Sequence, residues 1–202
     1  IALLLGMVCG YVGGKLDLIV QRFVDALLCL PGLIFLLVVL SLTGPGIIPV
    51  ILVMGLRSGI VDSRVVRSAV IRIKENEYVR AGKSIGCSTT RMLFRHILPN
   101  IMAPVIIIFT TRVPGIILTE ASLSFLGYGT PPPYPSWGGM LSGTGRNYMF
   151  MAPWMAFWPG LALSLAIFGI NMFGDAMRDL LDPRLRGKMG RYGIKANIGK
   201  KH

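Results

Sequence analysis

Two apolar spans of this chain are separated by the basic stretch Glu77-Tyr-Val-Arg-Ala-Gly-Lys-Ser-Ile-Gly86-Cys-Ser-Thr-Thr-Arg-Met-Leu-Phe-Arg-His-Ile-Leu-Pro99-Asn100. The order Gly86-Cys-Ser predicts that one helix ends with Gly86 in the left-handed conformation and that Ser88 is the N-cap of a second, short helix. Pro99 then starts the next apolar span, where its missing N–H costs little. We expect four cations on the exposed faces of this helix pair: Arg80, Lys83, Arg91 and Arg95. Four apolar residues are expected to anchor the pair: Val79, Ile85, Met92 and Phe94.

The composition around this stretch is that of a membrane protein. Hydrophobic residues make up 53% of the 202 residues, charged residues 15%, and the mean hydropathy is +0.65. A soluble domain of this length needs less apolar material for its core. The net charge of +12 stands in blocks beside apolar runs, so we expect membrane lipid or an acidic partner and no nucleic acid.

The apolar segments predict an all-α, polytopic transmembrane helical bundle of about five spans, since a helix needs roughly 20 residues to cross about 30 Å of hydrocarbon. The spans are expected near residues 1–14, 18–40, 47–74, 99–118 and 152–174. The first is too short to cross, so we expect it to begin mid-helix, with at least one further helix upstream. Without any internal repeat, residues 1–202 are expected to form a single transmembrane domain.

The basic residues also predict the orientation of the chain. If successive spans alternate in direction, 18 of the 21 Lys and Arg residues share one side of the membrane. By the positive-inside rule, residues 77–100 and the tail at 185–202 are cytoplasmic, and the Pro-rich loop at 131–137 faces outward. We therefore expect a multi-pass protein of the inner or plasma membrane with a cytoplasmic C-terminus.

The basic stretch resembles a known motif. Its pattern is Arg80-Ala81-Gly82, three residues, Gly86, nine residues, His96, one residue and Leu98-Pro99. This is similar to the EAA loop of ABC importer permeases, E-A-A-x3-G-x9-I-x-L-P, with Arg80, Gly82 and His96 as departures. The resemblance implies a cytoplasmic coupling helix that docks into an ATPase subunit through Arg80, Ala81, Gly82, Lys83, Gly86, Arg91, Leu98 and Pro99. From the residues alone, a basic loop lying on anionic lipid explains the stretch equally well.

Two later blocks resemble one branch of these permeases, the C subunits of dipeptide, oligopeptide and nickel importers. One block resembles their outer loop: Leu118-Thr-Glu120-Ala-Ser-Leu-Ser-Phe-Leu-Gly127 with Pro132-Pro-Tyr-Pro-Ser136-Trp137-Gly138. The other resembles their last helix and its cytoplasmic exit: Ala152-Pro-Trp154, Phe157-Trp-Pro-Gly160, Asn171, Gly174-Asp175, Arg178-Asp179 and Leu181-Asp182-Pro183-Arg184.

The resemblance implies a permease subunit that forms half of a translocation pathway and is not itself an enzyme. Its implied partners are a second permease subunit, two cytoplasmic ABC ATPase subunits and an extracytoplasmic solute-binding protein. ATP and Mg are expected on the ATPase subunits, with no cofactor, metal or catalytic residue in this chain. The sequence agrees, because Gly82-Lys83-Ser84 ends like a phosphate-binding loop but Glu77 stands where that loop needs its first Gly.

Four ionisable residues fall at membrane depth or close to it: Arg57, Asp62, Arg112 and Glu120. A charge in lipid costs at least roughly 2.5 kcal/mol, so each needs a partner or a wet cavity. One hypothesis is that Arg57 and Arg112 face the pathway and attract a carboxylate of a peptide-like solute. The alternative is that they pair with Asp or Glu of this chain or of the companion permease.

Small residues in the spans are candidates for close helix packing, which re-packing of a transporter requires. They are Gly6, Gly10, Gly13, Gly14, Gly160 and Gly169. Static packing explains each of these glycines equally well.

The substrate stays open at this stage between di- or oligopeptides and nickel or a metal chelate. A different class of membrane protein, a secondary transporter or a membrane enzyme, is a further alternative. An enzyme of the kinds considered would need a G-x-S-x-G elbow between a strand and a helix, or an H-E-x-x-H helix. Gly82-Lys-Ser84-Ile-Gly86 has the spacing of the elbow, but no strand is expected before it, and the sequence has no H-E-x-x-H. A secondary transporter would be expected to show inverted repeats, and none is visible.

Overall fold

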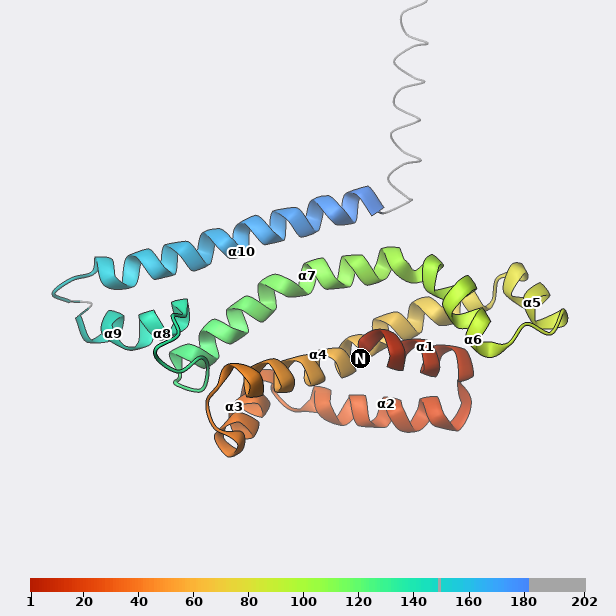
Figure 1. Cartoon of the computed structure of the whole chain (residues 1–202), viewed down its shortest axis with the longest axis horizontal. Coiled ribbons are helices and arrows are strands. Elements are labelled where there is room, and N and C mark those ends of the chain that lie inside the picture. Colours follow the sequence, from red (N-terminus) through yellow and green to blue (C-terminus); the bar gives the residue numbers. More distant parts are fainter. Residues whose placement is uncertain (149, 182–202) are drawn as a thin grey trace, which may run out of the picture.

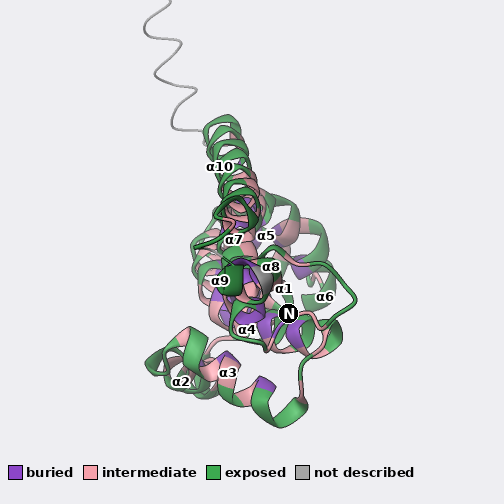
Figure 2. Ribbon diagram, turned by 90° about the vertical axis from the view of Figure 1, so that its left-hand side faces the viewer, coloured by how far each residue is buried: buried purple, intermediate pink, exposed green. Residues whose placement is uncertain are grey.

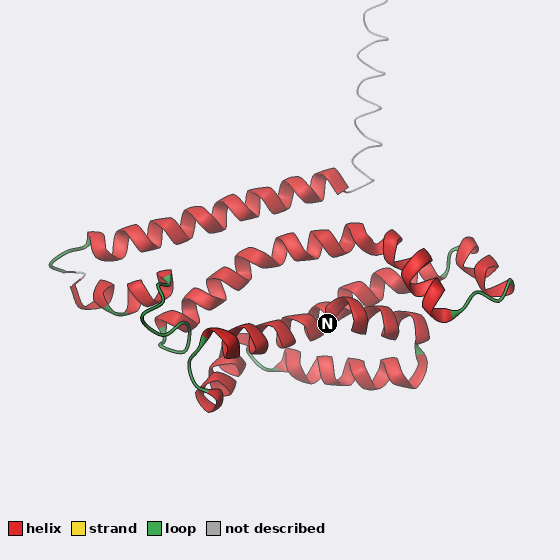
Figure 3. Ribbon diagram, viewed as in Figure 1, coloured by secondary structure: helices red, strands yellow, loops and turns green. Residues whose placement is uncertain are grey.

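The structure is a computed structural model that describes residues 1–148 and 150–181. Every regular element in this part is helical, as Figure 3 shows. The elements are α1 (Ala2–Val12), α2 (Gly14–Cys29), α3 (Gly32–Thr43), α4 (Ile47–Lys74), α5 (Glu77–Ser84), α6 (Thr89–Arg91), the π-helix η1 (Met92–Ile97), α7 (Leu98–Phe125), α8 (Trp137–Ser142), α9 (Thr144–Tyr148) and α10 (Trp154–Leu181). The predicted all-α class is therefore confirmed for the described residues. The predicted tail at 185–202 lies outside them.

Helix α4 is the central element of the fold. It packs against α1, α2 and α3 and also against α7, while α10 lies along the opposite side of α7 (Figure 1). Its buried side chains include Val50, Met54, Asp62, Val66 and Val70, which follow one another at intervals of four or eight residues. Residues four apart lie on neighbouring turns, and each such step turns about 40° around the axis, so the buried face winds around the helix. This winding face is apolar at both ends and carries a carboxylate in the middle.

Two apolar cores lie at the two ends of this face. The distal core joins α3, α4 and α7 through Leu36, Leu40, Val50, Met54 and Leu123. The hinge core joins α1, α4 and α7 to the segment at 77–97, which we call the hinge, through Met7, Val66, Val70, Val79, Met92, Leu93, Ile97 and Ile101. The hinge thus shares a packed core with the long helices, so it cannot move freely of them.

Two of the expected glycines bring α1 into close contact with α4. A Cβ at Gly6 would stand 2.5 Å from Val66 Cβ and 2.7 Å from the Ser63 carbonyl oxygen, and one at Gly10 would stand 2.8 Å from Val70 Cβ. The remaining glycine candidates do not lie at a close contact between helices. Gly13, Gly14 and Gly169 have open space around them, and Gly160 has one neighbour at 3.9 Å.

The span predicted at 18–40 is not one continuous helix. It is broken between Cys29 and Gly32, where α2 and α3 meet at a bend of 92°. Pro31 explains the break, because a proline disfavours helical conformation in the residue before it. Leu30 is accordingly extended, with φ −86° and ψ 125°. The predicted span at 18–40 therefore corresponds to two helices joined at a sharp bend.

Two helices are long and apolar enough to cross a membrane, the continuous segment Thr89–Phe125 and α10, and α2 with α3 makes a third if the bent pair is one span. Helix α1, with 11 residues, is too short. Helix α4 has 28 residues, but Arg57, Asp62 and Arg64 interrupt its apolar part. The predicted count of five spans therefore stays a prediction. Figure 2 shows that α10 is largely exposed, unlike α4 and α7.

We predict that Gly6→Ala lowers the free energy of unfolding by about 1–3 kcal/mol, because the new methyl group overlaps α4 backbone that cannot move aside. Gly169→Ala is the matched control, since it adds the same methyl group within a helix at a position with open space. The measurement is denaturant-induced unfolding of the purified protein in detergent. Equal stability of the two variants would contradict the close packing of α1 on α4.

Candidate functional site: a two-arginine cavity and a basic hinge

A cavity of about 230 Å³ lies between α3, α4 and α7. Its polar lining comes from Arg57 and Ser58 of α4 and from Arg112 and Thr119 of α7, and the rest is apolar or glycine. The two predicted arginines therefore meet at one cavity, although 55 positions separate them in the sequence. This cavity lies along α4 between the distal core and Asp62.

Arg57 has no carboxylate partner among the described residues. Its Nη2 donates to the Leu30 carbonyl at 3.4 Å, which the break before Pro31 leaves free, and its guanidinium lies 6.0 Å from the centre of the Phe35 ring. Its Nε is buried without a hydrogen-bond partner. A buried unpaired donor on a cation is costly. No carboxylate among the described residues neutralises the charge of Arg57.

Arg112 does have such a partner. Its Nη2 donates to Oδ1 of Asp62 at 2.5 Å, which joins the middle of α7 to the middle of α4. The Asp62 side chain is 10% exposed and that of Arg112 is 53% exposed. The carboxylate is thus held inside the helix packing, while much of the guanidinium stays accessible at the cavity.

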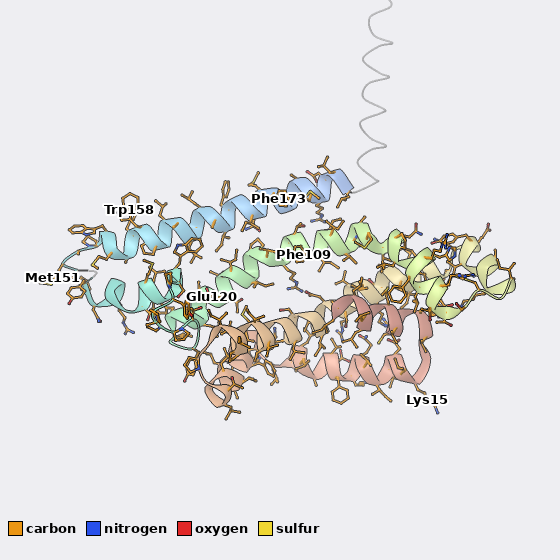
Figure 4. The ribbon with its side chains drawn as sticks, viewed as in Figure 1. Lys15, Phe109, Glu120, Met151, Trp158 and Phe173 are labelled. Atoms are coloured by element: carbon orange, nitrogen blue, oxygen red, sulfur yellow. The ribbon has the colours of Figure 1, made fainter. Side chains whose placement is uncertain are left out.

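Glu120 lies apart from these three residues, at the end of α7 nearest the loop to α8 (Figure 4). It accepts hydrogen bonds from the Ser124 hydroxyl at 2.6 Å and the Thr130 hydroxyl at 3.4 Å. It lines a second cavity of about 550 Å³, together with Trp137 and Met140 of α8. The four predicted ionisable residues therefore form one group of three and one separate carboxylate.

The hinge has the predicted turn. Gly86 has φ +77°, its N–H donates to the Lys83 carbonyl at 3.0 Å, and the next N–H donates to the Gly82 carbonyl at 3.1 Å. These two bonds form a Schellman motif. The Ser88 hydroxyl then accepts the Arg91 N–H at 3.4 Å, as an N-cap does. The predicted helix, turn and second helix are confirmed.

The predicted anchors of the hinge were half right. Val79 and Met92 are completely buried in the hinge core, whereas Ile85 is 85% exposed and Phe94 is 52% exposed. Ile85 is the C-cap residue of α5, beyond the part of the helix that packs. Phe94 lies in η1, whose wider π-helical turn brings Met92, Leu93 and Ile97 inward. Both exposed side chains therefore add apolar surface to the hinge.

The remaining predicted coupling residues differ in exposure. Arg80, Ala81, Lys83, Gly86, Arg91 and Pro99 are exposed, and Gly82 and Leu98 are half-buried. Gly82 has a packing role, because a Cβ there would stand 2.6 Å from Met92 Cε. The hinge thus presents cations around the exposed Ile85 while its inner side stays closely packed.

The sequence interpretation missed a polar ladder between α2 and α4. Asp17 binds Arg67 through two hydrogen bonds of 2.5 Å, Asp25 pairs with Arg64, and Gln21 accepts the Arg64 Nε at 3.2 Å. The signal was present, since Asp17, Gln21 and Asp25 are four residues apart on one helix face. Asp25 also pairs with Arg22 of its own helix, at 3.6 Å.

Residues 2–187 match the profile of a protein family described as binding-protein-dependent transport system inner membrane components. The chain belongs to this family. Such proteins are multi-pass components of transport systems in the inner membrane and not enzymes. The alternatives of a membrane enzyme and a proton-driven secondary transporter do not fit this family.

Several curated relatives of this inner membrane component are similar over most of its length. An oligopeptide transport system permease protein of Bacillus subtilis, OppC, is 38% identical over 186 residues, which are 92% of this chain and 61% of the relative. A dipeptide transport system permease protein of Alkalihalophilus pseudofirmus, DppC, is 36% identical over 182 residues, 90% and 60% of the two chains. A glutathione transport system permease protein of Pectobacterium atrosepticum, GsiD, is 37% identical over 182 residues, also 90% and 60%. The chain spans about three fifths of these relatives.

We predict that a double-mutant cycle with Asp62→Asn and Arg112→Gln gives a coupling energy of about 1–2 kcal/mol. A buried carboxylate that loses its cation costs several kcal/mol, and the exposure of Arg112 reduces that figure. Unfolding in detergent measures the cycle. The exposed pair Arg22 and Asp25 is the control, with an expected coupling below about 0.5 kcal/mol. A cycle at Asp62 and Arg112 that is no larger than the control contradicts the structural link between α4 and α7.

Proposed function

We propose that this chain is a permease subunit of an ATP-driven, binding-protein-dependent importer of di- or oligopeptides, and that it forms half of the translocation pathway. The observation that carries the proposal is the two-arginine cavity, where Arg57 faces the space with no carboxylate partner among the described residues. The names of the three relatives, which refer to oligopeptide, dipeptide and glutathione transport, support the same substrate class.

The cavity suits the carboxylate of a peptide. Guanidinium groups bind carboxylates through short, charge-assisted hydrogen bonds, and these are strong where water is partly excluded. Arg57 lines the cavity with a charge that no carboxylate of the described residues neutralises, and Arg112 is half exposed at the same wall. Because Asp62 neutralises Arg112, the cavity keeps about one net positive charge. That charge favours binding of one carboxylate without holding it so strongly that it cannot leave.

The same electrostatics argue against a free nickel ion as the substrate. A divalent cation that enters a cavity lined by two guanidinium groups meets repulsion. The carboxylate paired with Arg112, that of Asp62, is already neutralised, and none of the described residues that line the cavity is acidic. An anionic chelate would not meet this barrier. The peptide is favoured over the chelate because the relatives carry peptide names.

We further propose that the hinge couples the pathway to two cytoplasmic ABC ATPase subunits, which bind ATP and Mg. Arg80, Ala81, Gly82, Lys83, Gly86, Arg91, Leu98 and Pro99 form this coupling region. The exposed Ile85, with cations around it, has the character of an interface anchor with a charged rim. A second permease subunit and an extracytoplasmic solute-binding protein complete the system, with the C-terminus in the cytoplasm.

The transport step follows from the shared cores. Movement of the ATPase subunits shifts the hinge, and the hinge core transmits the shift to α4 and α7. These two helices carry Arg57, Asp62 and Arg112, so the cavity changes shape between an outward-open and an inward-open arrangement. Glu120 lies nearer the outer loop, where its cavity forms part of the entrance.

We predict that Arg57→Gln in the full-length permease, assembled with its partner subunits, lowers uptake of a peptide with a free C-terminus about tenfold. The loss corresponds to one charge-assisted hydrogen bond. Uptake of the same peptide with an amidated C-terminus should change less than about twofold. Arg146→Gln, which removes an exposed cation of α9 far from the cavity, is the matched control. An equal loss for both peptides removes the electrostatic role of Arg57.

We predict that Ile85→Asp lowers peptide-stimulated ATP hydrolysis by the assembled transporter about fivefold or more, because an apolar anchor at the proposed ATPase contact is lost. Phe150→Asp is the matched control, since Phe150 is 91% exposed and lies between α9 and α10 at the opposite end of the molecule (Figure 1). Unchanged coupling in the Ile85 variant would rule out this side chain as an ATPase contact.

A further inference from the structure

A third cavity lies at the end of the molecule that carries the hinge, where α1 turns into α2 and α4 approaches α5 (Figure 1). Its volume is about 390 Å³, within the range of roughly 300–1,000 Å³ that is usual for small-ligand sites. Its wall is apolar on the side of α1, where Cys9 and Gly10 are buried. Three cations line the opposite side: Lys74, Arg80 and Lys83.

These cations converge although they repel one another. The Lys74 Nζ lies 5.6 Å and the Lys83 Nζ 5.0 Å from the centre of the same ring, that of Tyr11. Lys74 also donates to the Tyr11 carbonyl at 2.5 Å, which fixes its position. Like charges that gather at one aromatic ring are costly unless an anion lies between them.

The acidic groups at the cavity do not supply that anion. Asp17 of α2 faces it, but both of its oxygens are bound to Arg67. Glu75, at the end of α4, is the other carboxylate of the lining and forms no ion pair among the described residues. One free carboxylate against three cations leaves the cavity positive. The C-terminus of α4 stabilises the nearby cations, because the helix dipole is negative at that end.

The orientation predicted for the chain indicates the source of the anion. The excess of Lys and Arg on this side of the chain predicts that it faces the cytoplasm, where anionic lipid headgroups lie. Basic pockets between helices at that level bind lipid phosphates. A headgroup phosphate could contact the cations of α4 and α5 while its glycerol end lies along the apolar wall of α1.

We propose that this cavity binds the phosphate group of an anionic phospholipid. The site lies apart from the two-arginine cavity, and it connects Lys74 of α4 to Arg80 and Lys83 of the hinge, which also belong to the proposed coupling region. A bound lipid therefore tightens the contact between the hinge and the long helices. Inorganic phosphate offers the same charged group without the acyl chains, so it distinguishes recognition of phosphate from recognition of lipid.

The test uses the full-length permease in its assembled complex, released from nanodiscs of phosphatidylglycerol and phosphatidylcholine in equal amounts. Native mass spectrometry counts the retained lipid. We expect Lys74→Gln and Lys83→Gln each to lower phosphatidylglycerol retention about fivefold, roughly the effect of one cation near an anionic surface. Lys74→Arg should retain the lipid. Lys15→Gln is the control. Lys15 lies at the start of α2, beside the turn between α1 and α2, but its side chain points away from the molecule (Figure 4).

The outcomes separate clearly. Equal retention of the two lipids by the unaltered protein, or an equal loss in Lys15→Gln, overturns the site. Displacement of phosphatidylglycerol by millimolar inorganic phosphate supports phosphate recognition but overturns the preference for lipid. Lys74→Gln removes a hydrogen bond between α4 and α1, so a loss of lipid in that variant could reflect misfolding. Lys83 forms no such bond among the described residues, so a loss of lipid in Lys83→Gln is assigned to the missing cation. The result does not depend on peptide transport, so failure of the proposed importer function would leave it unchanged.

Discussion

The ion pair between Asp62 and Arg112 sets the arrangement of the long helices. A carboxylate buried among packed helices is costly unless a cation pairs with it, so Asp62 of α4 needs a cationic partner. The available cation stands on α7, and pairing brings the two helices together at mid-length. Apolar packing on either side, in the distal core and the hinge core, then fixes their register. The polar contact and the two cores belong to one face of α4.

This arrangement explains how an event at the hinge can reach a site at membrane depth. Val79 and Met92 of the hinge share a core with Val66 and Val70 of α4, and the two-arginine cavity lies farther along that helix. Packed cores re-pack between discrete states more readily than they deform continuously. Arg57 donates to the Leu30 carbonyl, which is free because of the bend before α3, so this bond links α4 to that bend.

Structure that depends on a few neighbouring residues could be predicted from the sequence, whereas contacts between residues far apart in the sequence could not. Gly86 and Ser88 determine the hinge turn within a few residues, so the prediction was confirmed. Hydropathy located the segment at 18–40 but did not reveal the bend at Pro31, which is a local constraint of the proline. The exposure of Phe94 depends on a π-helical turn that periodicity does not reveal. Which acid pairs with Arg112 is a matter of tertiary packing, and the sequence offered several.

The most direct test of this account is a set of spin-label distances in the assembled transporter, with and without ATP, after replacement of the native cysteines. Labels at the exposed Thr90 of the hinge and Ser68 of α4 report whether the two move together. Labels at Ile34 of α3 and Ile116 of α7 report the width of the cavity. We predict a constant distance for the first pair and a nucleotide-dependent change for the second. A first distance that changes while the second stays constant would contradict the transmission of motion through the hinge core.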